Sequence, residues 1–227
     1  MIFPYRSLLL AIWICWSGFI CLAQSPAKGF HWDWHKVEKD NWESIAQSKA
    51  LSAKERAGLI EAVASQLRPF MSNLGIESEQ GLREAAAKTR IKAVDLGGKS
   101  AGEFAAQGVG VGPTPPRLCS PTGNCEFWVF RQNGDKYSVI LHRTATQSFT
   151  IQPTITNGFH DLVLNQHGSA FEQGLTLYRF DGSRYRFVAC YDANWEILGK
   201  DGEVHDLKEP RITPYSEVSS PTPCLME

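Results

Sequence analysis

EFWVFRQNGDKYSVIL (126–141) decides the fold, together with a similar stretch, LTLYRFDGSRYRFVACY (175–191). Each stretch consists of two runs of β-branched, aromatic and other apolar residues around a short polar segment. The segments are Asn-Gly at 133–134 and Asp-Gly at 181–182. Both pairs readily adopt the positive φ angles that tight hairpin turns need. The sequence therefore predicts two β-hairpins.

The two hairpins belong to an internal repeat. Each copy opens with an acidic residue and a short apolar strand: Glu103 in GEFAAQGVG (102–110), and Asp161 in HDLVLNQHG (160–168). The turn glycines, and the tyrosines three residues after them, are spaced by 48 residues in the sequence. Two copies are too few for a closed propeller, which has at least about four blades. We therefore expect one antiparallel sheet that is strongly curved, or folded into a small sandwich or open barrel.

Short helices are expected in the segment 24–89, before the strands. Positions 40–43 and 52–55 fit capping boxes, and each is followed by apolar residues at helical spacing. A third helix is expected over 79–89. The hydrophobic period changes to two over 90–192, which predicts a β-meander, and Gly, Pro and Ser dominate an irregular tail, 193–227. The expected class is α+β.

The first 23 residues predict a secretory signal peptide. Arg6 precedes an apolar run from Leu8 to Leu22, and small residues end the run before a cut at position 24. The run of about 15 residues is short against the roughly 20 that a spanning helix needs. Neither Cys15 nor Cys21 follows the small residue that a lipoprotein signal requires. We expect a bacterial secreted or periplasmic protein without a stable membrane anchor.

Charge and cysteine content agree with that compartment. Without Arg6, the 23 basic residues become 22 against 24 acidic ones, and they are interspersed, which argues against a nucleic-acid partner. The four remaining cysteines predict two disulfides, for which three connectivities exist. We expect Cys119–Cys125 to close a short Pro/Gly loop and Cys190–Cys224 to hold the tail.

The stretch GKSAG (98–102) admits two readings that the context argues against. It fits a nucleophile elbow with Ser100 as the nucleophile, but GVGVGPTPP (108–116) prevents the helix that an elbow needs. GGKS (97–100) suggests a phosphate-binding loop, but Ala93 stands where the first glycine is required.

A third reading of the same region is a calcium loop. Asp95 and Glu103 match the ends of an acidic calcium-binding turn, whereas Lys99 replaces a middle acid and can bridge the two carboxylates without a metal. DLGGKSAGEF (95–104) resembles a degenerate loop of the FG-GAP or VCBS type of extracellular β-repeat. Over roughly 40–192 the chain resembles uncharacterised secreted bacterial proteins with such repeats. The resemblance implies an extracytoplasmic β-domain and no particular reaction. We expect no cofactor.

Two polar clusters could carry chemistry. His160, Asp161, His167 and Ser169 form the densest one and would suit a hydrolase, although the repeat position of Asp161 favours a structural role. HWDWH (31–35) has two histidines four residues apart, but its place after the signal peptide favours an aromatic segment that docks on the domain or stays mobile.

The expected function is a non-catalytic binding module for a protein or polysaccharide of the cell envelope. Such a module would use exposed aromatic residues around the hairpins. The alternatives are a hydrolase that uses the cluster from His160 to Ser169, and a structural envelope protein whose helices mediate association. The candidate binding residues are Trp128, Tyr137, Phe180 and Tyr185.

Overall fold

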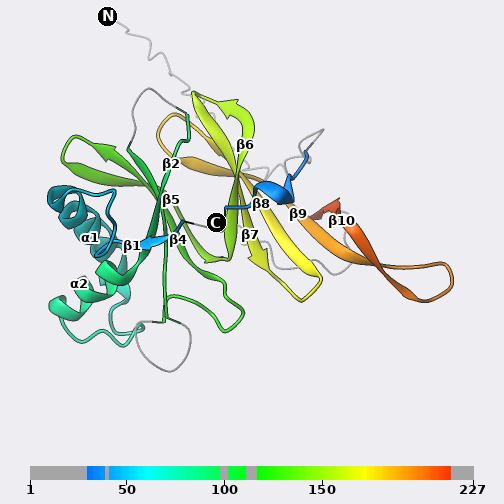
Figure 1. Cartoon of the computed structure of the whole chain (residues 1–227), viewed down its shortest axis with the longest axis horizontal. Helices are drawn as coiled ribbons and strands as arrows, with labels where there is room; N and C mark the ends of the chain where they lie inside the picture. Colours follow the sequence, from blue (N-terminus) through cyan, green and yellow to red (C-terminus); the bar gives the residue numbers. More distant parts are fainter. Residues whose placement is uncertain (1–29, 39–40, 98–101, 111–116, 216–227) are drawn as a thin grey trace, which may run out of the picture.

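A computed structural model of the chain describes residues 30–38, 41–97, 102–110 and 117–215 (Figure 1). The described strands are antiparallel and form two five-stranded sheets. Sheet I has the order β1-β2-β3-β4-β5, and sheet II has the order β10-β9-β8-β7-β6. The few helices beside an antiparallel meander confirm the expected α+β class, and the strands are divided between two sheets. In chain order the elements are η1 (Trp34–Lys36), β1 (Glu43–Ser44), α1 (Ala53–Leu67), η2 (Arg68–Phe70), α2 (Glu79–Lys88), β2 (Arg90–Val94), β3 (Glu103–Gln107), β4 (Cys125–Asn133), β5 (Lys136–Thr146), β6 (Ser148–Thr156), β7 (Phe159–His167), β8 (Glu172–Phe180), β9 (Tyr185–Leu198) and β10 (Val204–Pro214).

Each copy of the sequence repeat forms three neighbouring strands of one sheet: β3-β4-β5 in sheet I and β7-β8-β9 in sheet II. The turn glycines have positive φ as predicted, 60° at Gly134 and 105° at Gly182. The tight turn of the first hairpin consists of Gly134 and Asp135, one residue later than the predicted pair. The second hairpin has the longer loop 181–184.

A buried acidic residue in the first strand of each repeat faces an arginine in the second strand. In sheet I, Glu103 is 3% exposed and lies in register with Arg131. In sheet II, Asp161 is 1% exposed, and its carboxylate accepts a hydrogen bond from Arg179 Nε at 3.1 Å. Two threonine hydroxyls of β6 also donate to Asp161. The Asp161 carboxylate therefore accepts hydrogen bonds from side chains of neighbouring strands, which are the contacts of a structural residue.

The helices form where the capping signals predict them, with one exception. Ser52 and Glu55 make a reciprocal capping box at the start of α1, and the Ser78 hydroxyl caps α2. The helix predicted after the 40–43 pattern is wrong, because Glu43–Ser44 is strand β1 and pairs with β2. Position 40 itself lies outside the described residues. Pairing with a neighbouring strand thus overrides a local capping pattern.

Three hydrophobic clusters define the layers of the molecule. Helices α1 and α2 cover the outer face of sheet I (Figure 1). Sheets I and II share a second cluster between them, and the segment 30–38 packs on the outer face of sheet II. Strand β4 shows the consequence, since Trp128 and Phe130 pack toward the helices whereas Phe127 and Val129 pack toward sheet II. Both faces of its alternating pattern are therefore buried.

The prediction of an irregular tail from 193 is wrong for the described part. Strand β9 continues to Leu198, and β10 runs antiparallel to it from Val204 to Pro214. Most side chains of β10 are exposed or half-buried, so the strand lacks the alternation that marks a strand with one buried face. Backbone hydrogen bonds to β9 hold this strand, so the hydrophobic pattern of the sequence does not predict it.

One of the two predicted disulfides is present. Cys119 and Cys125 are bonded and close the short loop between them. Cys190 is also disulfide-bonded, but its predicted partner Cys224 lies outside the described residues, so the second pairing stays a prediction.

The two repeat tyrosines should respond oppositely to loss of the hydroxyl. The Tyr185 hydroxyl donates to the backbone carbonyl of His160 at 2.7 Å, so we expect Tyr185→Phe to lower the free energy of unfolding by about 1–2 kcal/mol. The Tyr137 hydroxyl is buried and has no hydrogen-bond partner among the described residues. Tyr137→Phe should therefore be neutral, or stabilising by up to about 1 kcal/mol. Denaturant titration of both variants measures the difference, and equal losses would contradict these assignments.

Candidate functional site

The aromatic residues predicted to bind a ligand lie in the hydrophobic cores. Trp128 is 0% exposed, and Phe180 and Tyr185 are each 2% exposed. Tyr137 is half-buried and packs against the cluster beneath the helices. Burial raises the pKa of Tyr185, and the nearby carboxylates of Asp161 and Glu103 raise it further. The prediction that these four form an exposed binding surface is therefore wrong, because the other layers cover the faces on which they lie.

The polar cluster from His160 to Ser169 is spread along β7. His160 lies near the start of the strand and His167 at its end, about 23 Å apart at the usual rise of a strand. The His160 ring contacts the carbonyl of Gln152, whereas the His167 backbone pairs with the Asn124 side chain. The Ser169 hydroxyl accepts backbone N–H bonds in the turn after β7. These residues do not form one catalytic site.

The predicted calcium loop is described only at its ends. Asp95 accepts a hydrogen bond from the backbone of Gly97 at 3.1 Å, and Leu96 accepts one from the backbone of His160 at 2.5 Å. The pKa of Glu103 is raised above its usual value. Burial is the largest cause, and the nearby charge of Asp95 adds to it, whereas the charge of Arg131 acts in the opposite direction. Lys99 and Ser100 lie outside the described residues. Over the ranges described, the structure has no group of three or more His, Cys, Asp or Glu residues placed to hold a metal ion. The loop joins β2 to β3 within sheet I, and its described start is hydrogen-bonded to β7 of sheet II.

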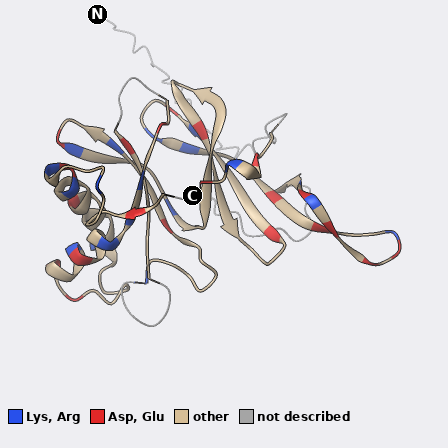
Figure 2. Ribbon diagram, viewed as in Figure 1, with Lys and Arg blue, Asp and Glu red and all other residues tan. Residues whose placement is uncertain are grey.

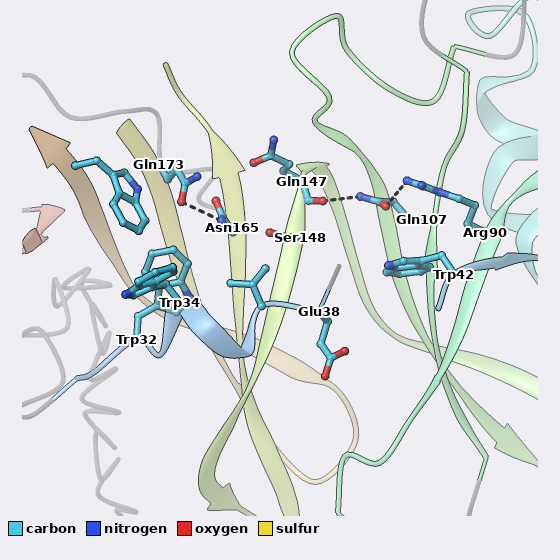
Figure 3. A pocket seen from close by; sticks show the side chains of 12 residues that line it. Trp32, Trp34, Glu38, Trp42, Arg90, Gln107, Gln147, Ser148, Asn165 and Gln173 are labelled. Carbon is cyan, nitrogen blue, oxygen red and sulfur yellow. Dashed lines mark hydrogen bonds between the residues drawn. The ribbon is translucent and has the colours of Figure 1, made fainter. Parts of the chain in front are cut away.

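A pocket that the sequence analysis did not predict lies where the chain passes from sheet I to sheet II (Figure 3). The passage is short, since Gln147 alone separates β5 from β6. The cavity has a volume of about 350 Å³, within the range of roughly 300–1,000 Å³ common for small-molecule sites. The pocket is rich in tryptophan and carboxamide side chains. Its twelve lining residues are Trp32, Trp34, Val37, Glu38, Trp42, Arg90, Gln107, Gln147, Ser148, Asn165, Gln173 and Trp195.

The tryptophans lie at both ends of this pocket. Trp42, from the segment before β1, lies beside Arg90 and Gln107 at the sheet I end (Figure 3). Trp32 and Trp34 lie at the sheet II end. The seven tryptophans of the chain include two within the predicted signal peptide, and four of the other five line this pocket.

Carboxamide groups connect the two ends. Asn165 Nδ2 donates to Gln173 Oε1 at 3.2 Å, and Gln107 Nε2 donates to the backbone carbonyl of Gln147 at 3.0 Å. Gln107 Oε1 accepts from Arg90 Nη2 at 2.7 Å. Figure 3 shows these groups in a row across the pocket. The hydrogen bonds fix the orientation of these side chains. Gln107 uses both Nε2 hydrogens, on the carbonyls of Thr146 and Gln147, whereas Asn165 keeps a hydrogen and an oxygen that can pair with a ligand.

Two polar atoms in this row have no hydrogen-bond partner among the described residues. They are Asn165 Oδ1 and Arg90 Nε, and both are buried. The Asn165 side chain is 3% exposed. A buried polar atom without a partner lowers stability, so such atoms are uncommon and call for an explanation. A bound ligand that hydrogen-bonds to them is one physical explanation.

The segment 30–38 forms one wall of the pocket, which confirms the docking expected for HWDWH. Trp32 is 4% exposed, and its Nε1 donates to the Thr150 hydroxyl at 3.1 Å. The Phe30 ring stacks on Tyr191 with centroids 3.9 Å apart. Glu38 donates a backbone hydrogen bond to Phe149 at 2.8 Å. A concentration of tryptophans outside the alternating strands is the one sequence signal that marks this segment.

Charges of both signs are interspersed over the sheets and helices (Figure 2). Within the described ranges, no helix is both long and apolar enough to span a bilayer.

In comparisons with known proteins, no family model, no curated protein and no solved structure matches this chain.

Proposed function

We propose that this protein is a non-catalytic module that binds a carbohydrate in the tryptophan-lined pocket. The observation that carries the proposal is the combination of four tryptophans with four carboxamide side chains in one cavity. A sugar ring has apolar C–H faces, which pack on indole rings, and a rim of hydroxyl groups, which pair with carboxamides. Tryptophans at both ends of the pocket would suit a ligand of two or more sugar units.

The charged groups of the pocket favour binding over hydrolysis. Most glycoside hydrolases use a pair of carboxyl groups on either side of the bond that is cleaved. Glu38 is the only carboxylate among the twelve lining residues, and it forms an ion pair with Lys92. Among the described residues, the pocket therefore lacks the pair that this chemistry requires, which supports the proposal of a binding module.

A secreted or periplasmic location is part of the proposal. The Cys119–Cys125 disulfide is typical of an oxidising compartment, and the predicted signal peptide would deliver the chain there. A polysaccharide of the cell envelope is then the natural ligand. The two meanders carry a buried acid and a turn glycine at matching positions, which supports the internal repeat. The likeness of this repeat to degenerate FG-GAP or VCBS repeats is part of the proposal.

Replacing the pocket tryptophans tests the proposal. Trp42 and Trp195 are half-buried and line the cavity, so we expect Trp42→Ala and Trp195→Ala each to weaken binding at least tenfold. The measurement is calorimetric titration with neutral and acidic oligosaccharides of three to six units, supported by tryptophan fluorescence. Phe70→Ala is the control, because Phe70 is 49% exposed and lies outside the pocket.

Two results would overturn the proposed function. One is that no oligosaccharide of the panel binds the wild-type protein. The other is that both tryptophan variants keep wild-type affinity while their thermal unfolding shows an intact fold. Turnover of a bound oligosaccharide by the wild-type protein would contradict the non-catalytic part and leave the site in place.

A further inference from the structure

The charges around the pocket are not balanced. Arg90 and Glu38 are the two charged residues among the twelve that line it. Lys92 forms an ion pair with Glu38 and neutralises it. Arg90 forms no ion pair with any residue of the described ranges, so its positive charge has no counterion among them.

The Arg90 side chain is held in place. Its Nη2 donates to Gln107 Oε1 at 2.7 Å, and its guanidinium carbon lies 5.9 Å from the centroid of the Trp42 ring. Its backbone is fixed by the register of β2 with β3, in which Arg90 pairs with Gln107. Arg90 Nε, which is buried, has no hydrogen-bond partner among the described residues. A guanidinium that is partly removed from water and lacks a counterion attracts an anionic group, and its planar fork suits a carboxylate.

The other end of the pocket offers an acceptor. Asn165 Oδ1 is buried and has no hydrogen-bond partner among the described residues, while the Nδ2 of the same side chain donates to Gln173. The site therefore combines a cationic donor at the sheet I end with a neutral acceptor at the sheet II end. A carboxylate would pair with the first and a hydroxyl with the second.

We propose that the pocket selects acidic saccharides, with the carboxylate of a uronic acid unit bound at Arg90 and a sugar hydroxyl donating to Asn165. This inference rests on the proposed function and adds the chemical class of the ligand. Neutral sugars satisfy the carboxamides and tryptophans but leave the Arg90 charge uncompensated. Acidic sugars make the same contacts with the carboxamides and tryptophans and also compensate the Arg90 charge.

Matched ligands test this selectivity. The probes are trisaccharides of galacturonic, glucuronic and mannuronic acid, each compared with its methyl ester, which has the same ring but no charge. We expect at least one acid to bind the wild-type protein about 10- to 100-fold more tightly than its ester, as for a hydrogen bond between charged groups. The affinity of the acid should fall as salt is raised, whereas that of the ester should change little.

Variants at Arg90 assign the selectivity. Arg90→Gln should remove the preference for the acid, and Arg90→Lys should keep part of it, because lysine keeps the charge but not the planar fork. Arg83→Gln is the control, since Arg83 is an exposed cation of α2 outside the pocket. Thermal unfolding of each variant shows whether the fold is intact, and the ratio of acid to ester affinity is read within each variant.

The outcomes separate the two proposals. Esters that bind as tightly as their acids, or an Arg90→Gln variant that folds and still prefers the acid, overturn the selectivity and leave a carbohydrate site standing. Failure of every acidic and neutral saccharide to bind overturns both.

Discussion

We expect Trp128→Ala to lower the free energy of unfolding by about 3–5 kcal/mol, the usual cost of removing a buried tryptophan. Trp128 is 0% exposed, lies in β4, which is paired on both sides, and packs into the core beneath the helices. Truncation leaves a cavity between sheet I and α1, because the surrounding backbone is fixed by strand pairing on both sides. In a chain of this size the melting temperature should fall by roughly 6–20 °C.

Denaturant titration followed by circular dichroism measures this loss. Trp128→Phe is the control, since it keeps most of the ring volume and removes an indole N–H that has no partner among the described residues. It should cost clearly less than Trp128→Ala. Because Trp128 does not line the pocket, saccharide affinity below the transition should stay unchanged. If Trp128→Ala kept wild-type stability but no longer bound saccharide, Trp128 would be a binding residue and not a core residue.

Trp32→Ala should release the segment 30–38 from sheet II and weaken saccharide binding at least 100-fold. Removing a buried tryptophan costs about 3–5 kcal/mol, which is more than the other contacts of so short a segment can offset. The segment forms one wall of the pocket, so its release removes Trp34 and Glu38 as well. We expect faster hydrogen exchange at the Glu38 amide, which is bonded to Phe149, and proteolytic cleavage within the segment.

Thr150→Val tests the hydrogen bond of Trp32 Nε1 separately from the burial of the Trp32 ring. It removes only the acceptor of the Trp32 indole N–H, so it should cost about 1 kcal/mol and leave the segment docked. Protection of the Glu38 amide and unchanged affinity in Trp32→Ala would show that the segment is not needed for the pocket.

Features that depend on a few neighbouring residues could be predicted from the sequence. The Ser52–Glu55 capping box marks the start of α1 because both hydrogen bonds lie within one helical turn. The turn glycines mark the hairpins because glycine has no Cβ and therefore adopts positive φ without strain. The Cys119–Cys125 bridge follows from the short loop between the two cysteines.

Features that depend on what covers a sheet could not be predicted in the same way. Alternation shows that Trp128 and Phe127 lie on opposite faces of β4, but not that one face meets α1 and the other meets sheet II. With both faces covered, no exposed aromatic surface remains there. The assignment of Phe180 and Tyr185 in sheet II to a binding surface is wrong because both side chains lie in the core that the two sheets share.

The sequence by itself determined the strands of the repeat, their turns, the two main helices and the α+β class, since each depends on local backbone preference and hydrophobic period. Only the tertiary structure decided where a ligand could bind. The pocket takes Trp42, Arg90, Gln107 and Asn165 from segments far apart in the chain, and no spacing between them carries a signal. Gln107 and Asn165 are buried polar residues of β3 and β7, and their role appears only when sheets I and II pack together and bring both to one cavity.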